Sequence, residues 1–160
     1  YAAELSADKI IQALVYFGAN PNNPCYQARA NKSTPLHELC APYHDSSCAL
    51  KIKSRQDAIE WLLAAGANTN AQDAQGATPF FGLVVCWKKR STSVLMESHE
   101  KKLFHEARKS LINVFLACKA NPDITDLSGK TLHTQTGDYV DSYLDLYVAF
   151  RFKERRQKLR

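Results

Sequence analysis

Apolar residues recur with helical spacing in three segments that align without gaps. The segments are 10–22 (IIQALVYFGANPN), 58–70 (AIEWLLAAGANTN) and 111–123 (LINVFLACKANPD). In each, an apolar pair is followed four residues later by a second pair, which places both pairs on one face of a helix. Each segment then ends in Gly or Lys followed by Ala-Asn, where a left-handed residue closes a helix. Gly18 and Gly66 adopt that conformation freely, whereas Lys119 adopts it against a steric penalty.

A second motif follows each of these predicted helices. It reads Thr34-Pro35-Leu36-His37, then Thr78-Pro79-Phe80-Phe81, then Thr131-Leu132-His133. A Thr hydroxyl accepts hydrogen bonds from free backbone N–H groups, and the fixed φ of Pro suits a first turn. The motif therefore predicts a helix start. The third copy lacks Pro and is poorly apolar beyond Leu132, so it is expected to be degenerate.

Together the two motifs resemble the ankyrin repeat, whose period of about 33 residues holds a turn, a Thr-Pro-Leu-His helix and a second apolar helix ending in Gly-Ala-Asp/Asn. The resemblance covers about residues 9–140. It implies an all-α solenoid of about three helix-pair repeats after a leading helix, with hairpin fingers along one edge. Because each repeat buries its apolar face only against its neighbours, we expect the stack to bury the apolar pairs. These include Leu14, Val15, Leu62, Leu63, Phe115 and Leu116.

We expect one domain over residues 1–160, as a fragment of a longer protein. Its predicted parts are a leading helix at 5–22, a first repeat at 23–70, a second repeat at 71–123, a degenerate capping repeat at 124–150 and a basic end at 151–160. The Thr-Pro motifs are spaced more widely than the usual period, so insertions are expected near 42–53 and 88–107. The second helix of the second repeat is expected to begin near Glu97. A stripe of Tyr and other apolar side chains over 139–148 predicts a last helix.

Composition narrows the class of protein. An apolar fraction of 45% and a charged fraction of 23% are typical of globular proteins, and no apolar run reaches the length of a membrane-spanning helix. Five cysteines without a short repeated spacing favour a reducing compartment, hence a cytoplasmic location.

The net charge of +5 is confined to the basic end, which holds six basic side chains and one acidic one. The remainder is neutral, which argues against a nucleic-acid-binding face. The basic end itself is open to three interpretations: a solvated helix end, a contact with an acidic partner, or a contact with anionic lipid or nucleic acid.

One cluster has the composition of a zinc site. It consists of His37, Cys40, His44 and Cys48. However, His37 is the histidine of the ankyrin helix start and Cys40 falls at a small core position, which favours structural roles for both. We therefore expect no metal and no cofactor, with this cluster as the alternative. No phosphate loop, paired-carboxylate motif or nucleophile elbow occurs in the sequence, so we expect no enzyme activity and no small-molecule substrate.

The resemblance implies a protein-interaction module that binds a partner through its concave surface and fingers. The candidate residues are Gln27, Arg29, Asn31, Glu38, Tyr43, His44, Asp73, Gln75, Trp87, Lys88, Lys89, Leu127 and Ser128. Tyr43 and Trp87 are the expected aromatic anchors. The charged segment 88–109 is either a solvated helix end or a surface for a partner.

Long insertions make the array similar in style to the ankyrin segments of effector proteins from intracellular bacteria. That similarity implies a host-cell protein as partner and the host cytosol as location. The alternative is a non-catalytic part of an enzyme whose active site lies in chain outside this sequence.

Overall fold

The computed structural model describes residues 7–24, 32–41, 49–91, 98–132 and 134. Within these ranges the regular structure is entirely helical, which confirms the predicted all-α class. The helices are α2 (Ala7–Tyr16), α3 (Pro35–Cys40), α4 (Ala49–Ala64), α5 (Pro79–Ser91) and α6 (Ser98–Ala117). The expected start of the second repeat's second helix near Glu97 is confirmed within one residue.

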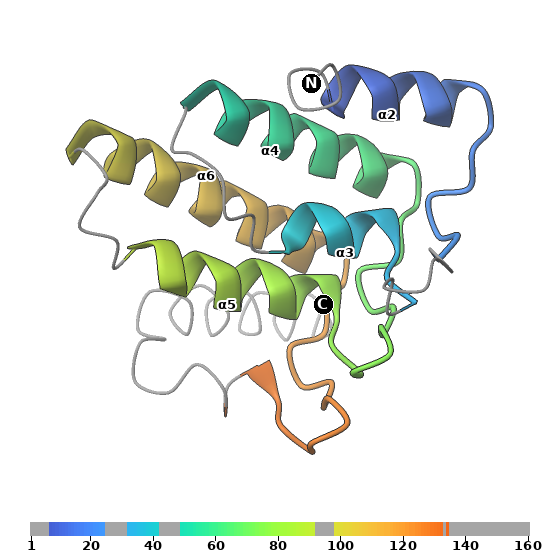
Figure 1. Ribbon diagram of the computed structural model, residues 1–160, viewed down its shortest axis with the longest axis vertical. Helices are drawn as coiled ribbons and strands as arrows, with labels where there is room; N and C mark the ends of the chain where they lie inside the picture. Colours follow the sequence, from blue (N-terminus) through green and yellow to red (C-terminus); the bar gives the residue numbers. More distant parts are fainter. Residues whose placement is uncertain (1–6, 25–31, 42–48, 92–97, 133, 135–160) are drawn as a thin grey trace, which may run out of the picture.

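The helices form two layers. Helices α2, α4 and α6 lie side by side in one layer, and α3 and α5 pack against each other in the second (Figure 1). Each short first helix also contacts the second helix that follows it in the chain, α3 with α4 and α5 with α6. This is a stack of helix pairs, preceded by α2 as the leading helix.

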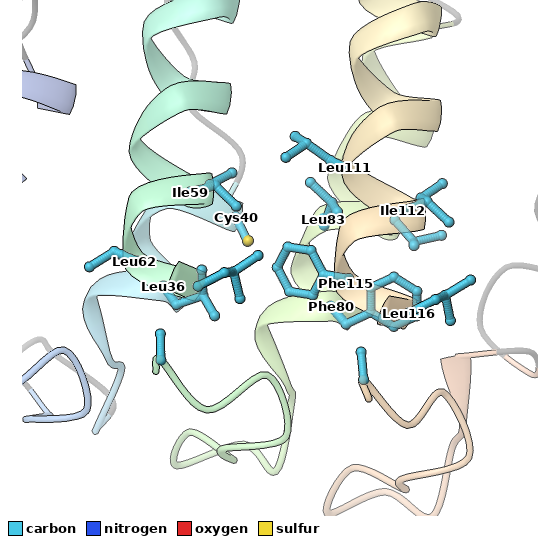
Figure 2. Close-up of a cluster of buried hydrophobic side chains, with 14 of the residues drawn as sticks. Leu36, Cys40, Ile59, Leu62, Phe80, Leu83, Leu111, Ile112, Phe115 and Leu116 are labelled. Carbon is cyan, nitrogen blue, oxygen red and sulfur yellow. The ribbon is translucent and has the colours of Figure 1, made fainter. Parts of the chain in front are cut away.

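The core fills the space between the two layers. Figure 2 shows Leu36 of α3 beside Leu62 of α4, and Phe80 of α5 beside Phe115 of α6. The rings of Phe80 and Phe115 stack with centroids 5.5 Å apart. Of the six side chains predicted to be buried, four are: Leu62, Leu63, Phe115 and Leu116. Leu132, in the degenerate third motif, is also buried in this core.

The leading helix departs from the prediction. Leu14 is 54% exposed, although Leu62 and Phe115, at the same position of the later repeats, are 3% and 0% exposed. Val15 is only partly buried. The expectation that Leu14 is buried by the stack is therefore wrong. The reason is that α4 covers one side of α2, and no described helix lies on the other.

All three second helices end in the same way. At the end of α4, the Ala67 amide donates to the Leu62 carbonyl over 2.9 Å and the Gly66 amide donates to the Leu63 carbonyl over 3.1 Å. The same pair of bonds closes α2 around Gly18 and α6 around Lys119. The φ angles are 82° at Gly18, 86° at Gly66 and 62° at Lys119, so the predicted left-handed closure is confirmed, including the strained lysine.

The two expected insertions are partly helical. Helix α4 already begins at Ala49, α5 runs on to Ser91 and α6 begins at Ser98, so the extra chain lengthens the helices themselves. The connections at 42–48 and 92–97, the expected helix at 139–148 and the basic end at 151–160 lie outside the described residues.

Candidate interaction surface

The finger at 71–78 is built around one carboxylate. Asp73 Oδ1 accepts hydrogen bonds from the backbone amides of Gln75 and Ala77, both over 2.9 Å. The Asp73 amide donates to the Ala77 carbonyl over 3.0 Å, and the Gly76 amide donates to the Asp73 carbonyl over 3.0 Å. Gly76 has a φ of 77°, a conformation that suits glycine. Asp73, a predicted recognition residue, is therefore needed for the turn itself.

The next finger, at 124–131, repeats this geometry. Asp126 Oδ1 accepts from the amides of Ser128 and Lys130 over 2.8 and 3.0 Å. The Ser128 hydroxyl also donates to Asp126 Oδ1, over 2.7 Å. The hydroxyl of Ser128, another predicted recognition residue, is thus engaged inside its own finger.

The two fingers are joined to each other. The Leu127 amide donates to the Gln75 carbonyl over 2.9 Å. The amide group of Gln72 donates to the carbonyls of Thr125, over 3.0 Å, and of Gly76, over 2.8 Å. A Cβ on Gly76 would lie 2.8 Å from the Leu127 nitrogen, so the contact leaves no room for a side chain there. The fingers therefore form a braced pair.

His37 links its own helix start to the next finger. Its Nδ1 accepts from the Thr34 amide over 3.1 Å and lies 2.8 Å from the Thr34 hydroxyl. The proton is then on Nε2, which donates to the Ala77 carbonyl over 3.0 Å. His37 therefore has a structural role, as expected, and its bond to Ala77 adds a link between repeats.

This geometry bears on the zinc alternative. Both ring nitrogens of His37 are engaged in hydrogen bonds, and Cys40 is fully buried among core side chains. Neither is placed as a metal ligand. His44 and Cys48 lie outside the described residues, and among those that are described, His, Cys, Asp and Glu nowhere gather in a group of three.

Asparagines join successive helix ends. The side chain of Asn22 donates to the Gly66 carbonyl over 3.0 Å and accepts from the Asn68 amide over 2.7 Å. Asn70 makes the same two bonds one repeat later, to the Lys119 carbonyl over 3.0 Å and from the Asn121 amide over 2.7 Å. We call this series the asparagine ladder.

The remaining candidates fall into three groups. Glu38, Gln75 and Leu127 are exposed, and Glu38 accepts a hydrogen bond from the Ser33 hydroxyl. Leu127, at the tip of its finger, is 81% exposed. Three candidates lie in α5 at positions whose side chains are not described: Trp87, Lys88 and Lys89. The others lie outside the described residues: Gln27, Arg29, Asn31, Tyr43 and His44.

The structure adds an aromatic pair that the sequence analysis missed. Tyr16 and Phe17, at the end of α2, are each 83% exposed, and their rings meet edge to face with centroids 5.4 Å apart. The later repeats carry only small side chains at these two positions: Ala64 and Ala65, then Ala117 and Cys118. The alignment of the three segments could have revealed this pair. Small residues at the equivalent positions of the later repeats indicate that the stack has no buried site for an aromatic ring there.

Helices of the described part are all too short or too polar to cross a bilayer. The ankyrin-repeat family model matches residues 31–74. The chain is also 30% identical, over 104 residues, to the bovine (Bos taurus) inactive serine/threonine-protein kinase TEX14. That match spans 65% of this chain and 6% of the relative. The stacked helix pairs, Thr-Pro helix starts and joined fingers of the described part thus have the ankyrin-repeat fold.

Proposed function

We propose that this array binds a partner protein through the concave surface formed by its first helices and fingers. Ankyrin repeats are generally protein–protein interaction modules and are typically non-catalytic. The observation that carries the proposal is the pair of braced fingers, whose backbones are fixed to each other while the side chains of Gln75 and Leu127 remain exposed. A surface held in place before binding loses little conformational entropy when the partner docks.

The exposed side chains at the finger tips favour a partner that has an apolar patch bordered by polar groups. Leu127 offers an exposed aliphatic anchor, and Gln75 offers an amide that both donates and accepts hydrogen bonds. We propose Trp87 and Tyr43 as further anchors. Lys88 and Lys89 of α5 are proposed as basic residues at the border of the same binding surface.

The partner we propose is a host-cell protein, met in the cytosol of the host. The extra chain between the Thr-Pro motifs supports this hypothesis, because long insertions match the style of effector ankyrin segments. The alternative is that the array is a non-catalytic part of a larger enzyme. It is favoured by one observation, that the bovine relative is far longer than the segment matched here.

The test begins with capture of partners on the immobilised 160-residue chain and titration of the captured protein. Leu127→Ala and Trp87→Ala are expected to weaken its affinity at least about tenfold, corresponding to about 1.4 kcal/mol. Asn113→Ala, an exposed change on the second helix α6, is the matched control and should bind as the parent does.

Parent-like binding by both variants would place recognition elsewhere than on the concave surface. For the alternative function, enzyme activity is measured in a longer form of the chain, with and without the array. Enzyme activity that needs the array but survives Leu127→Ala would favour the role inside an enzyme.

A further inference from the structure

The N-terminal side of the array has an apolar face whose counterparts in the later repeats are buried. Ile10 is 43% exposed, whereas Ala58 and Leu111 at the same position are 0% and 1% exposed. Leu14 shows the same contrast with Leu62 and Phe115. Ala19 is exposed, and its equivalents Ala67 and Ala120 are buried. Thus α2 carries the apolar pattern of a packed second helix on a side that no described element covers.

Polar groups at the same end repeat the contrast. In the asparagine ladder, the Gly66 carbonyl and the Asn68 amide are bonded by Asn22 of the preceding repeat. The equivalent groups of the first helix end are the Gly18 carbonyl and the Asn20 amide. Within the described ranges neither has a hydrogen-bond partner. Among the described residues, nothing therefore occupies the donor and acceptor that a ladder asparagine would bind.

These two observations are independent, one apolar and one polar, and they point in the same direction. We infer that the N-terminal side of α2 is the docking face for two parts of the same polypeptide: the helix end of a further ankyrin repeat, and the first helix that pairs with α2. That first helix would cover Ile10 and Leu14, as α5 covers Phe115 through the Phe80 ring. The ladder residue of the further repeat would be an asparagine, whose side chain donates to the Gly18 carbonyl and accepts from the Asn20 amide.

A second copy of this chain, stacked end to end, fits the face less well. The last ladder position of the described part holds Asp123, where Asn22 and Asn70 stand in the earlier repeats. A carboxylate can accept from the Asn20 amide, but it cannot donate to the Gly18 carbonyl and would repel it. In each described repeat the covering first helix also comes from the chain just before the second helix, which favours the same polypeptide.

The test supplies a ladder asparagine, a finger and a first helix from the chain's own sequence. In the extended chain, a copy of residues 66–110 replaces residues 1–9, directly before Ile10. Since Ile10 and Leu111 are equivalent, the copied ladder residue Asn70 and the copied α5 enter in register. We expect the melting temperature to rise by about 5 °C or more and hydrogen exchange of the Asn20 amide to slow at least about tenfold.

Two variants separate the apolar and polar parts of the face. Leu14→Asp is expected to lower the melting temperature of both chains. The decrease should be several times larger in the extended chain than in the parent, where Leu14 is exposed. Changing the copied Asn70→Asp should remove the protection of the Asn20 amide while leaving the Leu14 effect intact. Equal Asn20 exchange in parent and extended chain, with equal Leu14→Asp effects, would overturn the inference.

Two measurements need only the parent chain. A synthetic peptide of residues 66–91 added in trans is expected to shift the NMR signals of the Asn20 amide and the Leu14 methyl groups, and Leu14→Asp should abolish both shifts. Absence of these shifts contradicts the inference even if the extended chain fails to fold. Sedimentation of the parent should show a monomer, and a dimer dissociated by Leu14→Asp would instead assign the face to a second copy.

Discussion

Helices α4 and α6 hold equivalent places in successive repeats, yet the arginine at the same position behaves differently in each. Arg55 of α4 donates through its guanidinium to the carbonyls of Leu39 and Ala41, at the end of α3. Arg108 of α6 is the equivalent residue, and its buried Nε has no hydrogen-bond partner within the described residues. Burial lowers the pKa of the Arg108 guanidinium, since the charged form loses water around it.

The lengths of the neighbouring first helices explain the difference. Helix α3 ends at Cys40, so its last carbonyls are free to accept from Arg55. Helix α5 continues to Ser91, so the carbonyls at the equivalent positions, Leu83 and Val85, lie inside a helix that uses them for its own backbone bonds. A longer first helix thus deprives the arginine of the following helix of its backbone acceptors. The helix pairs remain stacked nevertheless.

The largest expected effects compare how much α4 and α6 contribute to the free energy of unfolding through the core. Phe115→Ala should destabilise the domain by about 3–5 kcal/mol and Leu62→Ala by about 2–5 kcal/mol, because each leaves a cavity between the layers. Leu14→Ala is the control at the same repeat position and, being exposed, should cost less than about 1 kcal/mol. Urea unfolding monitored by circular dichroism gives all three values. A Leu14 effect as large as that of Leu62 would contradict the described packing of α2.

The arginine pair gives the next effect. Arg55→Met removes two charge-assisted hydrogen bonds at the end of α3 and should cost about 1.5–3 kcal/mol. Arg108→Met removes a partly buried charge whose Nε lacks a partner, and should be neutral or stabilising. Equal losses of unfolding free energy in the two variants would show that Arg108 is bonded as well as Arg55 is.

Motifs with a local physical cause were predictable from the sequence. The helix starts at Thr34 and Thr78, the helix ends at Gly66 and Lys119 and the start of α6 each rest on residues a few positions apart, and the structure agrees with them. The buried core followed from the three aligned apolar segments, except in α2. There Leu14 has the right pattern, but burial also requires a neighbour, and a pattern within one helix does not show whether the neighbour is present.

The candidate surface was less predictable, because it depends on which polar groups the fold uses itself. Asp73 and Ser128 were predicted as recognition residues from their place in the fingers, but hydrogen bonds inside those fingers engage their side chains. Tyr16 and Phe17 were counted with the apolar segment of α2, although their rings are exposed. Exposure of an aromatic residue at a helix end depends on the width of the packed face, which the spacing of apolar residues does not define.

Helix closure allows a finer comparison of α4 with α6. Gly66 has a φ of 86°, and apart from its chain neighbours no described residue comes within 4 Å of where a Cβ would lie, so Gly66→Ala adds backbone strain without a clash. We expect a loss of about 1–2 kcal/mol, the usual cost of a left-handed backbone for a residue with a Cβ. The change in melting temperature measures it. An unchanged value would contradict the closure assigned to α4.

Lys119 provides the reverse change and the smallest effect. It closes α6 with a φ of 62°, where a lysine is strained and a glycine is not. Lys119→Gly removes that strain but adds freedom to the unfolded chain, so the expected net gain is about 0.5–1 kcal/mol. The ladder bond is unaffected, because Asn70 donates to the backbone carbonyl of residue 119. Lys109→Gly, an exposed change inside α6, is the matched control and should cost about 1 kcal/mol. Because both variants remove one lysine charge and add one glycine, opposite signs in urea unfolding would isolate the backbone conformation as the cause. A loss of stability in both would mean that the α6 end tolerates lysine without strain, and that its closure differs from that of α4.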